Sequence, residues 1–201
     1  MRHASTREVF DYWNARRGSR FAPDRAEIEP GAIRRALGDS FIIAHDPVAG
    51  HPFRLAGTRV CSLFAREIKN EPFARLWDAG SKPPIGELLG VVADEAVGIV
   101  AGVGARIADG ATIDLELLLL PLAYRGRTHV RMLGVLAPLS TPYWLGTQAI
   151  EGLTLRTLRH LGTASQIAAA PRLVPAEGAI ASAPRVDAAQ RRFVLYQGGR
   201  A

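Results

Sequence analysis

The sequence is poor in cysteine, with Cys61 the one such residue among 201. A lone cysteine cannot close an internal disulfide, and the chain opens on polar residues rather than on the apolar stretch of a secretory signal. Residues 132–150 carry no charge, but Pro138, Pro142 and several hydroxyl side chains make this run a poor membrane span. We therefore expect a cytoplasmic protein without disulfides.

Motifs of well-known enzyme classes are also missing. The sequence has no nucleophile elbow, no Walker loop and no His-Glu-x-x-His pattern. Gly102-Val103-Gly104 is a weak echo of a dinucleotide loop, but it falls inside an expected strand, where close backbone packing or a bulge explains it better. Cys61 lies on an apolar turn, which favours a buried packing role over that of a nucleophile.

The net charge of +6 comes mostly from arginine. The arginines are scattered, in runs no longer than the pairs Arg16-Arg17, Arg34-Arg35 and Arg191-Arg192. This spacing favours a solvated basic surface and disfavours a nucleic-acid partner. A basic nucleic-acid adaptor stays open as an alternative, and it requires the arginines to converge on one face.

The clearest structural signal runs from Gly98 to Pro138. Asp109-Gly110 separates two apolar-rich runs, which is typical of a tight hairpin. Arg125-Gly126 predicts a second turn into a third strand, so we expect a three-stranded antiparallel meander. Residues alternate along 111–117, which indicates one buried face and one face that is at least partly wet.

The chain before the meander predicts two further strands and several helices. Ser5 and Glu8 form a capping-box pattern ahead of a helix that places Val9, Phe10 and Trp13 on one side. Five strands, with helices between the second and the third, predict an α+β fold in which helices cover one face of an antiparallel sheet. The expected elements are a short helix over 30–38, strands over 40–45 and 53–57, and helical segments between 58 and 97.

The signals weaken after Pro138. Leu153, Leu155, Leu158 and Leu161 fit either a helix or a strand. Residues 162–184 are rich in alanine and proline and are expected to lack a fixed structure, whereas residues 193–196 could dock as an edge strand. We divide the chain into flanking helices (1–38), a core (39–140) and a partly disordered extension (141–201).

Two groups of polar residues invite a chemical interpretation. Asp114 and Glu116 share one face of a strand, about 7 Å apart, and such carboxylates can act as acid and base if burial separates their pKa values. A solvent-facing pair, matched with arginines at 106 or 131, is the favoured interpretation. His45 and His51 flank Asp46, but their spacing favours a solvated loop over a metal site.

Several short motifs occur in a familiar order. Asp11-Tyr12-Trp13 is followed by Arg16-Arg17-Gly18, Ile28-Glu29-Pro30, Phe41-Ile42 and then Arg54-Leu55-Ala56-Gly57-Thr58 running into Leu63-Phe64. Over residues 8–140 this series resembles a family of PAS-like proteins common in alphaproteobacteria. Ala65 departs from the glycine usual there. The resemblance implies a PAS-like five-stranded antiparallel sheet used for sensing or partner binding, with no enzymatic activity, no agreed ligand and no named cofactor.

Pattern and resemblance together lead to one main hypothesis, a non-enzymatic sensory or regulatory module. The sheet and the helices over 58–97 would enclose a small apolar pocket. PAS-like domains often dimerise through an N-terminal helix, so the resemblance makes Val9, Phe10 and Trp13 the interface candidates for self-association or a protein partner. The ligand-binding candidates are Phe41, Phe53, Leu63, Trp77, Leu117 and His129.

Two of these assignments carry alternatives. On a PAS sheet His129 could in principle ligate haem, although a structural or wet-face position is favoured. A small-molecule enzyme would use the same pocket with Asp114, Glu116 or His129, and it requires those side chains to line a cavity.

Overall fold

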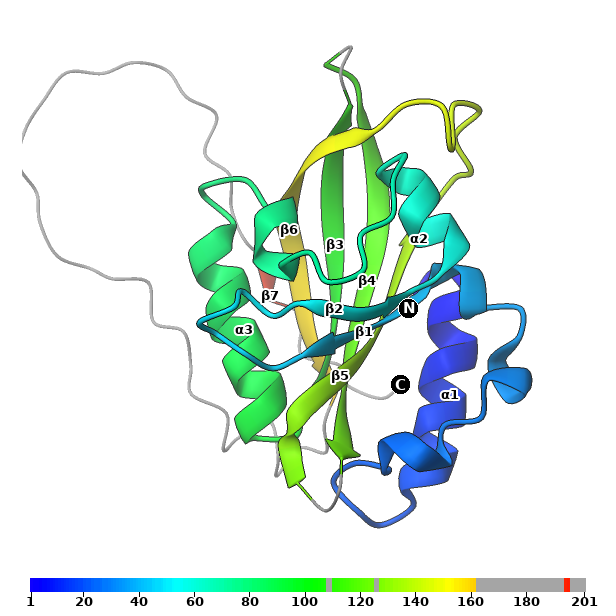
Figure 1. The fold of residues 1–201 in the computed structure, drawn as a ribbon, viewed down its shortest axis with the longest axis vertical. Helices are drawn as coiled ribbons and strands as arrows, with labels where there is room; N and C mark the ends of the chain where they lie inside the picture. The colour runs from blue at the N-terminus through cyan, green and yellow to red at the C-terminus, as the bar shows by residue number, and fades with distance from the viewer. Residues whose placement is uncertain (108–109, 125–126, 162–193, 196–201) are drawn as a thin grey trace, which may run out of the picture.

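One seven-stranded sheet organises the chain in a computed structural model that describes residues 1–107, 110–124, 127–161 and 194–195. The strand order is β2-β1-β5-β4-β3-β6-β7, and each neighbouring pair is antiparallel except β6 and β7 (Figure 1). The strands are β1 (Ser40–Ala44), β2 (Phe53–Ala56), β3 (Gly98–Ile107), β4 (Thr112–Tyr124), β5 (Arg127–Pro138), β6 (Ile150–Leu161) and β7 (Val194–Leu195).

Helices cover both faces of this sheet. The segments between β2 and β3 form one apolar core with its inner face, and the N-terminal segments form a second core with its outer face. In Figure 1, α1 and α3 lie on opposite sides of β1 and β5. The helices are α1 (Ala4–Arg17), α2 (Thr58–Leu63) and α3 (Lys82–Asp94), and the 3-10 turns are η1 (Arg25–Glu27), η2 (Pro30–Ile33), η3 (Leu37–Asp39) and η4 (Phe73–Leu76).

The α+β class and the antiparallel meander of β3, β4 and β5 are confirmed. The strand count differs from the expected five, because β6 and β7 extend the sheet beyond β3. The spacing of the leucines in β6 fitted both a helix and a strand. The segment forms a strand because it pairs with the edge of β3 along Gly98–Ile107. The expected edge strand over 193–196 corresponds to β7, whereas the expectation for 162–184 lies outside the described residues.

Residues just before α3 form hydrogen bonds that hold β6 in place. The amide of Asp78 donates to the carbonyl of Leu153 at 2.9 Å, and its carboxylate accepts a hydrogen bond of 2.6 Å from Thr154. The amide of Leu155 donates to the Ser81 hydroxyl at 3.1 Å. These contacts tie a strand from beyond residue 140 to the α3 layer, so it shares the core of the preceding residues.

The outer face of the sheet is not wet where α1 lies, which corrects the expectation of a partly solvated face. Val9 and Trp13 are buried against β4 and β5, and the Trp13 indole donates to the carbonyl of Pro121 at 2.8 Å. The sequence pattern missed this because the outward side chains of β4 are themselves apolar from Leu118 onward. The helix covers an apolar surface of its own chain.

The capping-box prediction for α1 is wrong. His3 is the N-cap, and its Nδ1 accepts from the amide of Ser5 at 3.2 Å. Ser5 lies inside the helix and donates its hydroxyl to Asp39 at 2.6 Å. The Ser5 side chain therefore bonds to the distant buried carboxylate of Asp39, and not to Glu8 as the local pattern predicted.

Glycines mark close approaches within the sheet. A Cβ on Gly134 would lie 2.1 Å from the Phe41 ring. On β3, a Cβ on Gly102 or Gly104 would lie within 2.5 Å of Thr157 or Arg156. Close packing, and not a nucleotide loop, is thus the role of Gly102 and Gly104. The turn at Asp109 and that at Arg125-Gly126 lie outside the described residues.

Among the described residues, no helix is both long and apolar enough to cross a bilayer.

Candidate functional site

An aromatic cluster fills the inner face of the sheet beneath the helices. Phe41 from β1 and Phe53 from β2 lie 5.4 Å apart between ring centroids, and each lies 5.7 Å from Phe73 of η4. Trp77 lies 5.7 Å from Phe73 at an interplanar angle of 65°. All four rings are buried, so β1, β2 and η4 meet through aromatic packing. We call Phe41, Phe53, Phe73 and Trp77 the aromatic cluster.

The structure brings most of the predicted ligand residues into this core. Phe41, Phe53 and Trp77 belong to the aromatic cluster, and Leu63 and Leu117 are buried in the same apolar core. His129 lies on β5, but its side chain is not described. Phe73, absent from the predicted set, joins Trp77 to the two strand aromatics, and its position four residues before Trp77 was the available signal. The ligand role of these residues stays a prediction.

Trp77 carries an unusual polar atom for this environment. Its side chain is 2% exposed, and its Nε1 finds no hydrogen-bond partner among the described residues. Buried indole N–H groups normally have an acceptor. Within the part of the chain that the structure describes, the aromatic cluster thus holds a hydrogen-bond donor without an acceptor.

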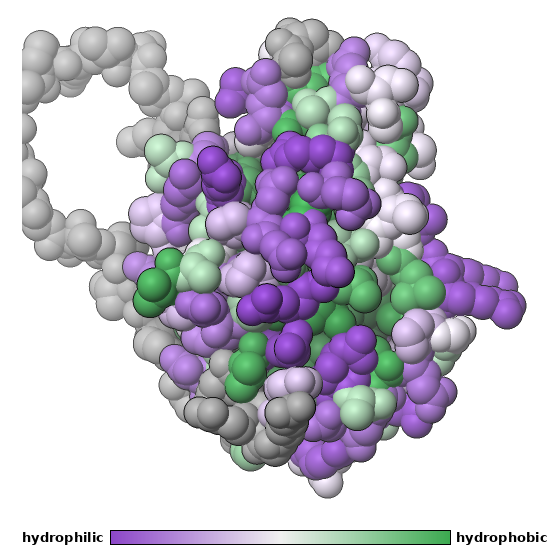
Figure 2. Space-filling view, in the orientation of Figure 1, coloured by the Kyte–Doolittle hydropathy of each residue, from purple (hydrophilic) through white to green (hydrophobic). Residues whose placement is uncertain are grey.

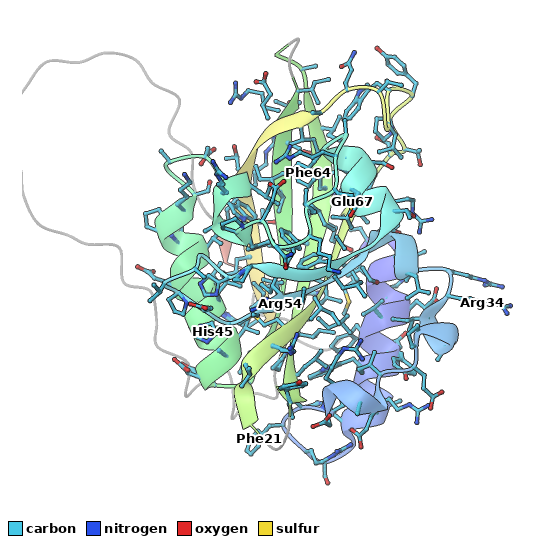
Figure 3. All side chains as sticks on the ribbon, in the orientation of Figure 1. Phe21, Arg34, His45, Arg54, Phe64 and Glu67 are labelled. Atoms are coloured by element: carbon cyan, nitrogen blue, oxygen red, sulfur yellow. The ribbon has the colours of Figure 1, made fainter. Side chains whose placement is uncertain are left out.

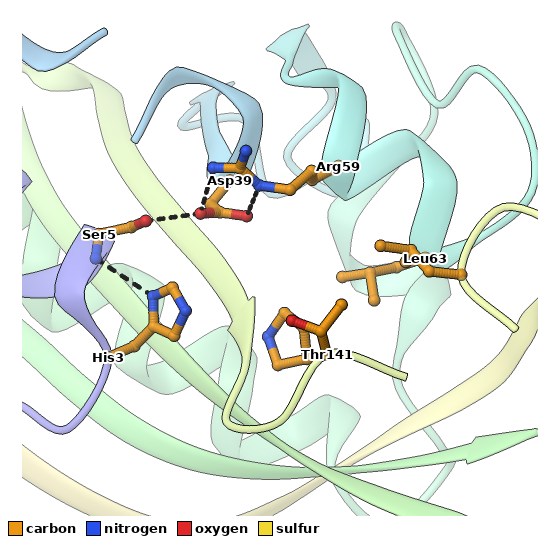
Figure 4. Close-up of a pocket in the computed structure, with 8 residues that line it drawn as sticks. His3, Ser5, Asp39, Arg59, Leu63 and Thr141 are labelled. Atoms are coloured by element: carbon orange, nitrogen blue, oxygen red, sulfur yellow. Dashed lines mark hydrogen bonds and ion pairs between the residues drawn. The ribbon is translucent and has the colours of Figure 1, made fainter. Parts of the chain in front are cut away.

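A separate cleft of about 250 Å³ opens where α1, η3, α2 and the segment after β5 meet (Figure 4). Of the predicted ligand residues, Leu63 lines it. The other wall residues were not predicted, because they come from four places in the chain with no shared local spacing. The cleft is lined by His3, Ser5, Asp39, Arg59, Leu63, Pro138, Thr141 and Leu145.

Asp39 is the buried polar centre of that cleft wall. It is 2% exposed, and Arg59 donates to its two carboxylate oxygens through Nε and NH2, both at 2.7 Å. Ser5 donates to the same carboxylate, and Arg59 also reaches the carbonyl of Arg35 at 2.8 Å. The hydrogen bonds that Arg59 donates to Asp39 raise the pKa of Arg59. Gly38 leaves room for this guanidinium, since a Cβ there would lie 2.9 Å from it.

The two carboxylates of β4 have different surroundings. Asp114 is exposed and forms an ion pair with Arg156 of β6. Glu116 is buried at 6% exposure and accepts from the amides of Arg2 at 2.6 Å and His3 at 3.0 Å. The expectation of a solvent-facing pair matched with arginines at 106 or 131 is therefore wrong for Glu116, and the partner of Asp114 is a different arginine. Neither carboxylate lines the cleft.

The loop between β1 and β2 stacks its two histidines, with ring centroids 5.1 Å apart. His45 is half-buried, whereas His51 is 4% exposed, so the solvated-loop expectation is wrong for His51. Burial, together with the neighbouring His45, lowers the pKa of His51 to about 4, against a smaller opposite effect of Asp46. Among the described residues, no group of three potential ligands gathers around a metal site.

The predicted interface residues on α1 lie mainly against the chain's own sheet. Val9 and Trp13 are buried, and Phe10 is half-buried with its ring 6.3 Å from that of Trp13. Self-association through these residues stays a prediction. In the present arrangement, Phe10 is the most accessible of the three.

Exposed arginines are distributed around the molecule, and several have acidic partners. Figure 2 shows a largely hydrophilic strip over β2, and Figure 3 places Arg54 there, whereas Arg34 projects from a different side. Residues 162–201 hold five arginines and two acidic residues, hence half of the net charge of +6. Exposed arginine side chains form ion pairs that include Arg16–Glu29, Arg20–Glu27, Arg66–Glu71 and Arg106–Glu151.

This architecture is that of an α+β domain whose sheet has the core order β2-β1-β5-β4-β3, with the intervening helices on its inner face. A model of the PAS domain family matches residues 1–137. The chain belongs to the PAS domain family. The resemblance inferred from the motifs is thereby confirmed.

Solved structures with a similar fold are distant in sequence. The blue-light activated histidine kinase EL346 of Erythrobacter litoralis is 14% identical with a TM-score of 0.41, covering 54% of this chain and 36% of the kinase. A PAS domain from Colwellia psychrerythraea is 14% identical (TM-score 0.41; 52% and 92% covered), and a light-oxygen-voltage domain is 18% identical (TM-score 0.44; 56% and 85% covered). The chain spans about a third of the kinase's length. A comparison with curated proteins gave no match.

Proposed function

We propose that the chain is a non-enzymatic regulatory module, acting in the cytoplasm through small-molecule and protein binding. The observation that carries this proposal is the PAS family match over α1 and the first five strands. The aromatic cluster supports a small-molecule site on the inner face, because Phe41, Phe53 and Trp77 converge there from three separate segments. Leu63, Leu117 and His129 complete the proposed ligand set.

The unpartnered indole of Trp77 supports ligand binding in particular. A buried donor without an acceptor costs about 1–3 kcal/mol. A ligand that accepts a hydrogen bond from Nε1 would remove this cost, so its binding would favour a slightly opened arrangement of the rings. Movement of η4 would carry that signal to the surface.

The arrangement of the carboxylates supports a non-enzymatic role. The enzyme alternative needs Asp114, Glu116 or His129 in a cavity, whereas Asp114 pairs on the surface and Glu116 binds backbone amides. The positions of Asp114 and Glu116 favour a role in stabilising the fold. The spread of the arginines, several of them paired with acidic residues, likewise argues against a nucleic-acid face.

Native mass spectrometry of the purified chain tests this function. We expect a copurified small-molecule mass that is lost on denaturation, and a Trp77→Phe variant that retains clearly less of it, because the variant keeps a ring but lacks the donor. Phe21→Ala, at a side chain 63% exposed and distant from the cluster, is the control. A dimer without ligand would support the protein-binding part alone, and a ligand-free monomer with no partner would refute the proposal.

A further inference from the structure

The cleft between α1, η3, α2 and the segment after β5 has the composition of a ligand site outside the aromatic cluster. Its lining combines polar groups, on His3, Asp39 and Thr141, with apolar ones, on Leu63 and Leu145. Figure 4 shows the Asp39 carboxylate, the His3 ring and Thr141 around the same open space, with Leu63 opposite. The volume of about 250 Å³ accommodates a molecule on the order of ten non-hydrogen atoms.

The charges in the wall favour an uncharged occupant. Asp39 and Arg59 are paired through two hydrogen bonds of 2.7 Å, so the wall contains one negative and one positive group in direct contact. An anion would approach a buried carboxylate, and a cation would approach the guanidinium that neutralises it. Either would also lose its own hydration without gaining an unpaired counter-charge.

Hydrogen-bonding capacity remains unused on three wall groups. His3 Nδ1 accepts from the Ser5 amide, so the neutral ring carries its proton on Nε2 and can donate from there. Asp39 Oδ1 accepts one bond, from Arg59 Nε, and therefore has room for a second donor. The Thr141 hydroxyl lines the cleft, has no partner among the described residues, and can donate or accept.

We propose that this cleft binds a small neutral molecule with an apolar body and a carboxamide-type head group. The carbonyl of the head group accepts from His3 Nε2 and Thr141, and its N–H donates to Asp39. The apolar body lies on Leu63, Pro138 and Leu145. This site goes beyond the proposed function, because it lies outside the aromatic cluster and shares one residue, Leu63, with the proposed ligand set.

The position of the cleft gives such a ligand a structural effect. His3 and Ser5 begin α1, whereas Thr141 and Leu145 lie on the segment that leads from β5 to β6. An occupant that contacts both segments favours the state in which α1 is docked. Binding is therefore linked to the position of α1 on the sheet.

Titration of the full chain followed by two-dimensional amide NMR tests the proposal with three probes of one skeleton. These are cyclohexanecarboxamide, cyclohexanecarboxylate and cyclohexylmethylamine, which are neutral, anionic and cationic at neutral pH. We expect saturable shifts around His3, Asp39 and Thr141 with the carboxamide, and at least about tenfold weaker binding of the two charged probes. Equal or tighter binding of a charged probe would overturn the proposed ligand class.

Variants locate the site. His3→Asn keeps a good N-cap but removes the ring nitrogen, and Thr141→Val removes the hydroxyl at constant shape. Each should weaken carboxamide binding about fivefold or more, whereas Thr112→Val, at an exposed threonine of β4, should leave it unchanged. Unaltered binding in both cleft variants, saturable shifts confined to the Trp77 indole, or no saturable shift with any probe would refute the site.

Discussion

Glu116 shows what a single buried carboxylate does for this fold. Its oxygens accept from the amides of Arg2 and His3, which precede α1, so it places negative charge at the start of that helix. Glu116→Ala leaves both amides without an acceptor beside β4. We expect the free energy of unfolding to fall by about 2 kcal/mol in urea denaturation.

Glu151→Ala is the matched control for Glu116. Glu151 pairs with Arg106 at 3.2 Å, but both side chains are about half exposed. Solvent weakens such pairs, so its removal should change the free energy of unfolding by no more than about 0.5 kcal/mol. Equal losses in the two variants would contradict a special role for the buried carboxylate.

His51 makes stability depend on pH. Its pKa is about 4 in the folded chain against 6.5 ordinarily, so between these values the unfolded chain binds more protons. Stability from this group is full above pH 6.5 and is lost as the pH falls through 4, with a limit of about 3 kcal/mol. His51→Asn removes the titration and tolerates the local φ of 60°.

Urea denaturation of both proteins at pH 7 and pH 4.5 checks this effect. We expect the wild type to lose about 2 kcal/mol more than His51→Asn between the two conditions. Every other titratable group is present in both proteins, so the difference reports His51 together with its contact with His45. Parallel pH profiles would show that His51 does not contribute.

Residue-scale prediction from the sequence succeeded where neighbours in the chain define the environment. Alternation along β4 correctly placed Asp114 and Glu116 on one face, but it could not reveal that the chain's first residues cover Glu116. The contact of Asp39 with Arg59 spans 20 residues and that with Ser5 spans 34. No period or motif links such positions, so the cleft could be found only from the folded chain.

At the scale of elements, Trp13 is the largest buried side chain between α1 and the sheet. Trp13 is 2% exposed and donates to the carbonyl of Pro121. Trp13→Ala should lower the free energy of unfolding by about 3–5 kcal/mol and speed hydrogen exchange along α1. Phe21→Ala, at a side chain 63% exposed, should leave both unchanged. Slow exchange of α1 in the Trp13 variant would indicate that other contacts hold the helix.

Replacing glycine by alanine should have opposite effects on stability on one strand and on one helix of this chain. A Cβ on Gly134 of β5 would enter the Phe41 ring, so Gly134→Ala should destabilise the protein by about 3 kcal/mol. Gly86 of α3 has no atom within 4 Å of such a Cβ, and Gly86→Ala should stabilise the helix by about 0.5–1 kcal/mol. Thermal and urea denaturation measure both. Changes of the same sign would contradict this packing.

Element prediction was limited where two periods coincide. Leu153 and Leu155 are two apart, whereas Leu155, Leu158 and Leu161 are three apart, so spacing alone supports strand and helix alike. The open hydrogen-bonding edge of β3 resolves the choice, because a strand satisfies those groups and a helix cannot. That edge exists only once the sheet has formed.

For the whole molecule, the buried core extends beyond the family match. The match ends at residue 137, but Trp144, Ile150, Leu153 and Leu155 complete the inner core at 5% exposure or less. Burial of four such side chains contributes on the order of 8 kcal/mol, which is comparable with the total stability of a domain. We therefore expect residues up to the end of β6 to be needed for the fold.

A chain that ends at residue 138 tests this extent against one that ends at 161. The shorter chain leaves the β3 edge without β6 and exposes the core positions that β6 covers, and such edges promote association. We expect it to aggregate or to unfold without cooperativity, whereas the longer chain should unfold cooperatively like the full one. Light scattering after size exclusion and urea denaturation measure the two properties. A monomeric shorter chain with an unchanged midpoint would assign β6 to a role outside the stability of the PAS core.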